Sequence, residues 1–156
     1  IARLCREKFA AYRRKHPDVP EVEITCGDTS FWQQRAGTGL AASGTVTVES
    51  AIAGLPLVVG YKLNWITILM ASLVVKLYRG FFTMVNIIAN RAVFEEFLQH
   101  RFAPGKLIPA VERILPGGER REEVERGMAE VRQLLTPNSS SAARQAAEAC
   151  YSVVSD

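Results

Sequence analysis

The fold is decided by one continuous stretch, GLAASGTVTVESAIAGLPLVVGY, which occupies residues 39–61. Its first four residues are small and apolar, which suits a short buried strand, and Ser43-Gly44-Thr45 then forms a tight turn. Residues 46–53 follow the pattern of a helix ending at Gly54, because glycine readily adopts the left-handed conformation that ends many helices. The apolar run over 56–61 is typical of a strand in a parallel sheet. The stretch therefore predicts a βαβ unit and an α/β fold.

Further helices and strands are expected on both sides of this unit. Towards the N-terminus, the pattern predicts an amphipathic helix over 2–15, a half-buried strand over 21–25 and a short helix up to residue 35, capped by Asp28 or Thr29. Towards the C-terminus we expect a short strand over 81–85, helices over 91–99, 104–115, 119–135 and 142–154, and a loop over 136–141. Residues 1–156 form a single domain in this interpretation, and 119–156 supply additional C-terminal helices.

Composition and charge exclude several classes of protein. The 156 residues are 48% hydrophobic and 22% charged, a globular mixture that excludes a disordered tail. The formal net charge of +3 is too small to indicate a nucleic-acid partner. Cys5, Cys26 and Cys150 are an odd number at wide spacing without a CxxC motif, which argues against a disulfide framework or a zinc site. The first residue is Ile1 rather than Met, so we expect residues upstream to be missing.

The most apolar region extends from Ala51 to Tyr78 but is too interrupted to span a membrane. Its longest uncharged run, residues 63–75, has 13 residues, whereas a spanning helix needs about 20. Residues 64–76 are expected to form a helix that Asn64 caps. Such a helix is either buried between other elements or presents a face to lipid or an acyl chain, in which case Trp65 and Leu69 make that contact.

The turn at Ser43-Gly44-Thr45 is the most informative candidate site. Where a strand ends and a helix begins, unpaired backbone N–H groups and the positive end of the helix dipole can bind a phosphate. The alternative is that Ser43 or Thr45 simply caps the helix. Glu49 lies one turn further along, where its carboxylate could accept hydrogen bonds from a ribose, or face solvent.

A second polar cluster consists of Asn86, Asn90 and Arg91. Arg91 could bind a phosphate through two hydrogen bonds, whereas Asn86 could also merely cap the next helix. Other chemistry lacks support. His16 and His100 have no partner at a spacing typical of a catalytic triad or metal site, and the adjacent Glu95 and Glu96 point to different sides of the expected helix.

Three motifs together resemble the lipid-A-disaccharide synthase family. They are residues 41–51, residues 54–62, and residues 82–91 followed by 96–99, and the resemblance covers roughly residues 24–135. The family usually has glycine at the position of Asn90 and an acid at the position of Ala92. The resemblance implies a Rossmann-like parallel sheet flanked by helices, the C-terminal half of a GT-B fold, with the N-terminal acceptor domain absent.

The resemblance also implies an activity, found in Gram-negative bacteria. An inverting glycosyltransferase of this kind transfers diacylglucosamine from UDP-diacylglucosamine to diacylglucosamine 1-phosphate, forming the lipid A disaccharide and releasing UDP. Two alternatives stay open: another UDP-sugar-dependent GT-B enzyme, or a nucleotide-binding module without catalysis of its own. We expect no turnover by this part alone, because the general base is expected in the missing N-terminal half.

The implied roles of individual residues follow the motifs. Ser43, Gly44 and Thr45 would contact the pyrophosphate, Glu49 the ribose, and the donor side of the cleft would be lined by Asn86, Arg91 and Gln99. No cofactor and no metal are expected, because UDP-sugar is a substrate. The implied substrates are UDP-diacylglucosamine and a lipid acceptor. The resemblance also implies a cytoplasmic protein that binds peripherally to the inner face of the inner membrane and pairs with a second copy in a homodimer.

Overall fold

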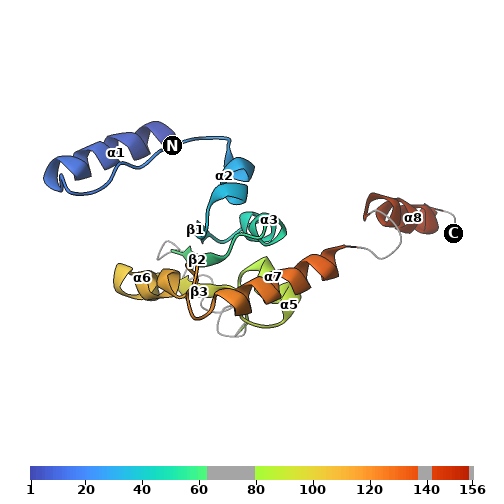
Figure 1. Ribbon diagram of the computed structural model, residues 1–156. Coiled ribbons are helices and arrows are strands. Elements are labelled where there is room, and N and C mark those ends of the chain that lie inside the picture. Colours follow the sequence, from blue (N-terminus) through green and yellow to red (C-terminus); the bar gives the residue numbers. More distant parts are fainter. Residues whose placement is uncertain (63–79, 137–141, 155–156) are drawn as a thin grey trace.

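The computed structural model describes residues 1–62, 80–136 and 142–154 of the chain, and these form a mixed α/β structure (Figure 1). The expected helix over 64–76, with Trp65 and Leu69, lies outside the described residues. The sheet has three parallel strands in the order β1-β2-β3. These are β1 (Gly39–Ala42), β2 (Leu57–Tyr61) and β3 (Glu95–Leu98). The predicted α/β class with a parallel sheet is therefore confirmed.

The central strand β2 forms the middle of the hydrophobic core. Residues 57–60 are buried, and Val59 pairs with Ala41 of β1 on one side and with Glu96 of β3 on the other. By contrast, β1 alternates between half-buried and exposed residues, and the side chain of Leu40 is 52% exposed. The strand over 39–42 was expected to be buried. It is an edge strand of the described sheet, and the face that carries Leu40 and Ala42 is exposed.

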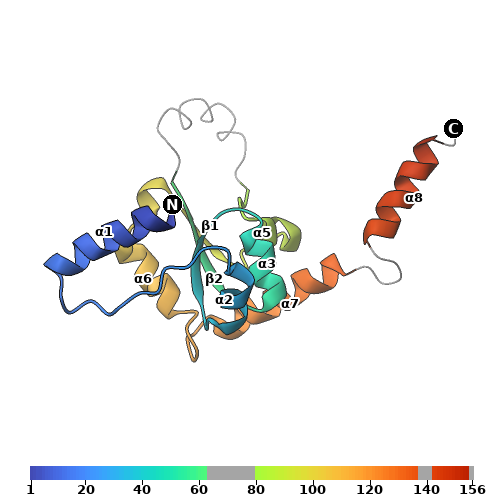
Figure 2. The same ribbon diagram turned by 90° about the horizontal axis from the view of Figure 1, so that it is seen from above.

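Helices cover the sheet unequally (Figures 1 and 2). One face carries α3 (Val46–Ala53), α5 (Met84–Ala89) and α7 (Arg121–Leu135), which pack against one another. The other face carries α6 (Pro104–Glu112) against β2, while α2 (Thr29–Arg35) packs beside α3. The core between them includes Val85, Phe94, Met128 and Val131, each at most 1% exposed. The βαβ unit predicted from residues 39–61 is thus built as expected, with Gly54 in the left-handed conformation at the end of α3.

The two terminal helices pack less closely. Helix α1 (Ala2–Lys15) contains no buried residue, and α8 (Ala142–Val154) stands apart from the sheet and its helices in both views (Figures 1 and 2). Both helices have the extents expected from the sequence. No helix within the described ranges combines the length and the hydrophobicity needed to cross a membrane.

Two predicted elements around residue 86 are wrong. Residues 81–85 were expected to form a strand, but Thr83 is the N-cap of α5 and its hydroxyl accepts a hydrogen bond from the Asn86 N–H. Residues 91–99 were expected to form a helix, but they contain β3. Apolar residues at 93, 94, 97 and 98 fit a helical period. Residues 95–98 nevertheless form a strand, because each of them pairs with a residue of β2 in the parallel sheet.

The strand predicted over 21–25 does not form either. These residues are irregular, and no described strand lies beside them to complete a ladder. Side chains hold the segment instead: Arg6 donates to the Ile24 carbonyl over 2.9 Å, and the Trp32 indole N–H donates to the Thr25 hydroxyl over 2.9 Å. Alternation of polar and apolar residues is not sufficient for a strand without a neighbour to pair with.

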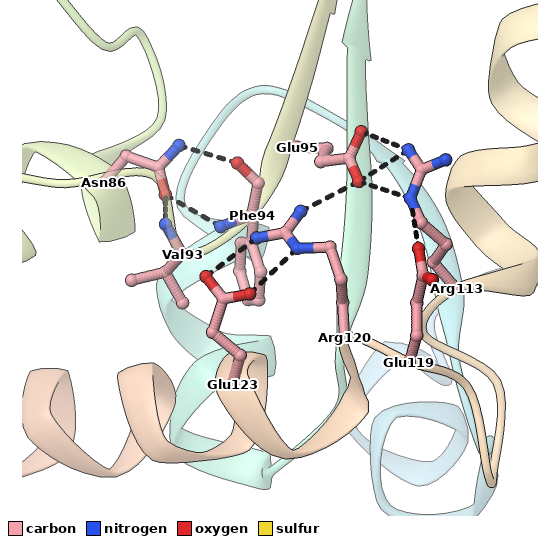
Figure 3. Close-up of polar contacts among 8 residues, drawn as sticks. All are labelled: Asn86, Val93, Phe94, Glu95, Arg113, Glu119, Arg120 and Glu123. Atoms are coloured by element: carbon pink, nitrogen blue, oxygen red, sulfur yellow. Dashed lines mark hydrogen bonds and ion pairs between the residues drawn. The ribbon is translucent and has the colours of Figure 1, made fainter.

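An ion-pair cluster ties β3 to the two helices that follow it (Figure 3). The carboxylate of Glu95 accepts hydrogen bonds of 2.8 Å from both Arg113, after α6, and Arg120, before α7. Arg120 also pairs with Glu123 on α7 at 3.0 Å. Burial by itself raises the pKa of Glu95, but the hydrogen bonds and charges of the two arginines outweigh it, so this pKa lies below its ordinary value.

We predict that Glu95→Gln lowers the free energy of unfolding by about 2 kcal/mol at pH 7, because two partly buried arginines lose their shared counter-charge. Since the folded-state pKa of Glu95 is lowered, the contribution is present above its ordinary value of 4.5 and is lost as pH falls through the lowered pKa. Urea unfolding at pH 7, 5 and 3 should show the difference between wild type and variant shrinking at the lowest pH. A difference that stays constant down to pH 3 would contradict this assignment.

Candidate functional site

The turn between β1 and α3 lies at the carboxyl edge of the parallel sheet, where ligands of open α/β folds bind. Gly44 has a φ of +156°, and a Cβ added there would meet no atom within 4 Å. Its carbonyl accepts two hydrogen bonds from Thr47, from the hydroxyl at 2.8 Å and from the N–H at 3.1 Å. Thr47 is fully buried, so it holds the turn from beneath and leaves the outer side open.

The backbone N–H groups of residues 44–46 are available to a ligand. No described residue accepts a hydrogen bond from any of the three. Thr45 is the N-cap of α3, but its side chain makes no capping bond and is exposed. The alternative interpretation, in which Ser43 or Thr45 serves as a capping side chain, is therefore not what the structure shows. Unpaired N–H groups at the positive end of a helix dipole suit an anion.

Ser43 has a partner within the protein. Its hydroxyl donates to the carbonyl of Phe82, 39 residues further along the chain, over 3.2 Å. The hydroxyl hydrogen is thereby used to join the turn to the segment that leads into α5. In this arrangement Ser43 anchors the turn, and Gly44 and Thr45, which follow it, are exposed.

Glu49 lies on the same exposed side of α3 as Thr45. Its N–H donates to the Thr45 carbonyl at 3.1 Å, which places it one turn beyond the start of the helix. The side chain is exposed, and no partner for its carboxylate occurs among residues 1–62, 80–136 and 142–154. Glu49 therefore lies one helical turn beyond the open turn at residues 43–45, as its spacing predicts.

Gln99 combines two unusual features at the end of β3. Its backbone has a φ of +51°, a left-handed conformation that is strained for a residue other than glycine. Its side-chain nitrogen Nε2 is buried and has no hydrogen-bond partner in the described structure. Because neighbouring strands lie about 4.8 Å apart, the ends of β1 and β3 are separated by about 10 Å at the same edge. Gln99 and the turn after β1 therefore lie at the same edge of the sheet.

Asn86 is fully buried and has no polar atom left for a ligand (Figure 3). Its amide nitrogen donates to the Phe94 carbonyl and to the Glu96 carboxylate, both at 2.8 Å. Its amide oxygen accepts from the N–H groups of Val93 at 2.8 Å and Phe94 at 2.9 Å. These four bonds use the whole capacity of the amide. Its role here is to position the segment before β3.

Arg91 lies away from the turn after β1. It precedes β3 and hence lies towards the amino end of that strand, and its guanidinium forms an ion pair of 2.6 Å with Glu130 of α7. The structure therefore does not bring Arg91 together with Ser43, Gly44 and Thr45. Its neighbour Asn90 has a φ of +50° and ends α5, a position that favours glycine first and asparagine second.

Sequence reasoning overlooked Lys62 as a source of positive charge. Lys62 directly follows β2, and the register that pairs Ala42 with Gly60 places it level with the turn after β1. It is exposed and lines a hollow of about 410 Å³, together with Ala42 and Tyr61. A lysine at the carboxyl end of the neighbouring parallel strand is the signal that could have identified it.

No group of three histidine, cysteine or acidic side chains suited to a metal ion occurs in the part of the chain that the structure describes. His16 lies against the ring of Tyr12, with ring centres 4.4 Å apart, and His100 is exposed.

Comparison with known proteins gives one consistent result. A family model described as lipid-A-disaccharide synthetase matches residues 15–150. The chain is 40% identical to a lipid-A-disaccharide synthase of Solibacter usitatus over 125 residues, which are 80% of this chain and 32% of that protein. It is 34% identical to one of Koribacter versatilis, covering 88% of this chain and 36% of the relative. The chain thus spans about a third of the length of these relatives.

Mutation of two asparagines four residues apart, Asn86 and Asn90, should affect stability to very different extents. Asn86→Ala removes four buried hydrogen bonds, and we expect it to lower the free energy of unfolding by about 3 kcal/mol. Asn90→Gly is the matched control at an exposed, left-handed position, and we expect a change within about 0.5 kcal/mol or a slight stabilisation. Urea unfolding followed by circular dichroism measures both. An Asn86→Ala variant as stable as wild type would show that the amide does not hold this segment.

Proposed function

The chain belongs to the lipid-A-disaccharide synthetase family, and on that basis we propose that it forms the donor-binding half of an inverting GT-B glycosyltransferase. The proposed reaction transfers diacylglucosamine from UDP-diacylglucosamine to diacylglucosamine 1-phosphate, which yields the lipid A disaccharide and UDP. The observation that carries this proposal is the open turn after β1, where three N–H groups have no acceptor among the described residues and an exposed acid lies one helical turn away.

The donor is assigned to the carboxyl edge of the sheet. The N–H groups of residues 44–46 and the Thr45 hydroxyl bind the pyrophosphate, and the Glu49 carboxylate accepts hydrogen bonds from the two ribose hydroxyls. Gln99 lies at the same edge, and we assign its amide nitrogen, which is buried and has no partner among the described residues, to a phosphate or sugar oxygen of the donor. Ser43 and Asn86 support these groups from within the protein rather than contacting the donor through free polar atoms.

Negative charge develops on the β-phosphate as UDP departs, and it has to be stabilised. Fixed N–H groups at the start of α3 are suited to this task because they need no reorganisation during the reaction. We assign the accompanying cation to Lys62 rather than Arg91, because Arg91 is paired with Glu130 of α7, whereas Lys62 is exposed beside the turn. The general base that activates the acceptor hydroxyl is expected outside this chain.

The partners follow from the chemistry of the substrates. Both sugars carry acyl chains, so we propose that the protein works as a peripheral protein at the inner face of the inner membrane, on the cytoplasmic side. The apolar residues 64–76 are the segment proposed to approach lipid or the acyl chains. We further propose a homodimer in which C-terminal segments are exchanged. The separation of α8 from the sheet, with its residues 144–152 exposed, supports such an exchange.

The donor site is tested by titrating the chain with UDP in a calorimeter. We expect UDP to bind in preference to UMP and GDP, because the proposed donor is a sugar attached to uridine diphosphate. Glu49→Ala should weaken UDP binding about tenfold, the loss expected for one charge-assisted hydrogen-bonding group. Glu122→Ala, at an exposed position of α7, removes the same charge elsewhere and should leave the affinity unchanged.

Equal loss of affinity in both variants would assign the effect to net charge and contradict the ribose contact. A folded chain that does not bind UDP at all would contradict the proposed donor site. Comparing UDP-diacylglucosamine with UDP-N-acetylglucosamine then separates the proposed reaction from that of another UDP-sugar-dependent GT-B enzyme. The diacylated donor should bind more tightly, because its acyl chains add buried apolar surface.

A further inference from the structure

The entrance to α5 is held by a single carboxylate, that of Glu96 on β3. Its oxygen Oε1 accepts hydrogen bonds from the Thr83 N–H at 2.9 Å, the Thr83 hydroxyl at 2.7 Å and the Asn86 amide at 2.8 Å. The N–H of Phe82 lies 3.2 Å from both carboxylate oxygens. Four donor groups from three residues therefore converge on one side chain that is only partly exposed.

A carboxylate is well matched to this position because it is an acceptor without any donor of its own. Glutamine has nearly the same shape, but it replaces one oxygen by an NH₂ group. That group would face the N–H of Phe82 or the donors of Thr83, leaving at least one donor at this position without an acceptor. The arrangement thus depends on the chemistry of the acid as well as on its size.

The same segment reaches the turn after β1. The carbonyl of Phe82 accepts the hydrogen bond from the Ser43 hydroxyl, while the N–H of Phe82 is held by Glu96. Hydrogen bonds therefore connect Glu96 of β3 to Phe82, the residue before the N-cap of α5, and connect Phe82 to Ser43 in the turn after β1. The adjacent Glu95 takes no part in these hydrogen bonds, because alternate residues of a strand point to opposite sides and Glu95 meets Arg113 and Arg120.

We infer that Glu96 is a positioning residue for the donor site: it fixes Phe82, and through Phe82 and Ser43 it sets the turn that binds the pyrophosphate. This inference rests on the proposed function for the identity of the ligand. It assigns the role to a residue that never contacts the donor, and it predicts that Glu96 influences UDP binding only while the Ser43 hydroxyl is present.

A double-mutant cycle on the full chain tests the inference, with UDP as the probe. Glu96→Gln and Ser43→Ala should each weaken UDP binding about fivefold to tenfold. The double variant should bind no more weakly than either single variant, because both break the same connection. Glu95→Gln is the matched control: it changes the neighbouring carboxylate and lowers stability, and it should leave the UDP affinity within about twofold. All titrations are made at a temperature where circular dichroism shows each variant folded.

Effects that multiply in the double variant would overturn the inference, since Glu96 would then act by a route that does not include Ser43. An unchanged affinity in Glu96→Gln would overturn it as well. If Glu96→Gln does not fold, Glu96→Asp, which withdraws the carboxylate by one methylene, enters the same cycle.

A second measurement separates this inference from the proposed function. In amide ¹H–¹⁵N spectra of the ligand-free chain, Glu96→Gln should shift the signals of Ser43, Gly44 and Thr45, and Glu95→Gln should leave them in place. If wild type fails to bind UDP but these shifts occur, the proposed function fails and the positioning role stands. If the signals of the turn do not move, the positioning role is overturned whatever the chain binds.

Discussion

One buried amide, that of Asn86, fixes how α5 and β3 meet. Four hydrogen bonds join it to the backbone of Val93 and Phe94 and to the carboxylate of Glu96. An unpaired polar group at such a position would cost stability, so the chain can place α5 and β3 together only in the arrangement that satisfies the amide. When the segment between α5 and β3 adopts this arrangement, β3 lies beside β2 and its side chains point to defined faces of the sheet.

Because side chains alternate between the two faces of β3, the adjacent carboxylates of Glu95 and Glu96 have different partners and different roles. Glu95 faces Arg113 and Arg120 and binds α6 and α7 to the sheet, which serves stability. Glu96 faces the entrance of α5 and connects, through Phe82, to the turn after β1. Because strand residues alternate in direction, neither acid can replace the other, although they are neighbours in the sequence.

The carboxyl edge of the sheet gathers groups that are left open, whereas the residues behind it are paired. Thr45, Glu49 and Lys62 are exposed near one another along this edge, and Gln99 holds a buried amide nitrogen without a described partner. Thr47, Ser43 and Asn86 already have partners within the protein. Supporting side chains that already have partners thus lie behind the edge, and side chains without described partners lie along it, which is the arrangement that the proposed donor site requires.

Elements with local signals can be predicted from the amino-acid sequence alone. Glycines bounded the βαβ unit over 39–61, helical spacing marked α1, α7 and α8, and the position of Glu49 one turn after Thr45 followed from helix geometry alone. The strand at residues 95–98, by contrast, depends on tertiary contacts, because its apolar spacing also fits a helix and only pairing with β2 selects the strand. The tertiary structure also decided that Arg91 pairs with Glu130, and that Asn86 and Ser43 are used inside the protein. Arg91 and Ser43 bind residues 39 positions away, and the bonds of Asn86 depend on whether residues 93–96 form a strand or a helix. Local spacing therefore cannot indicate the partner of any of these three side chains.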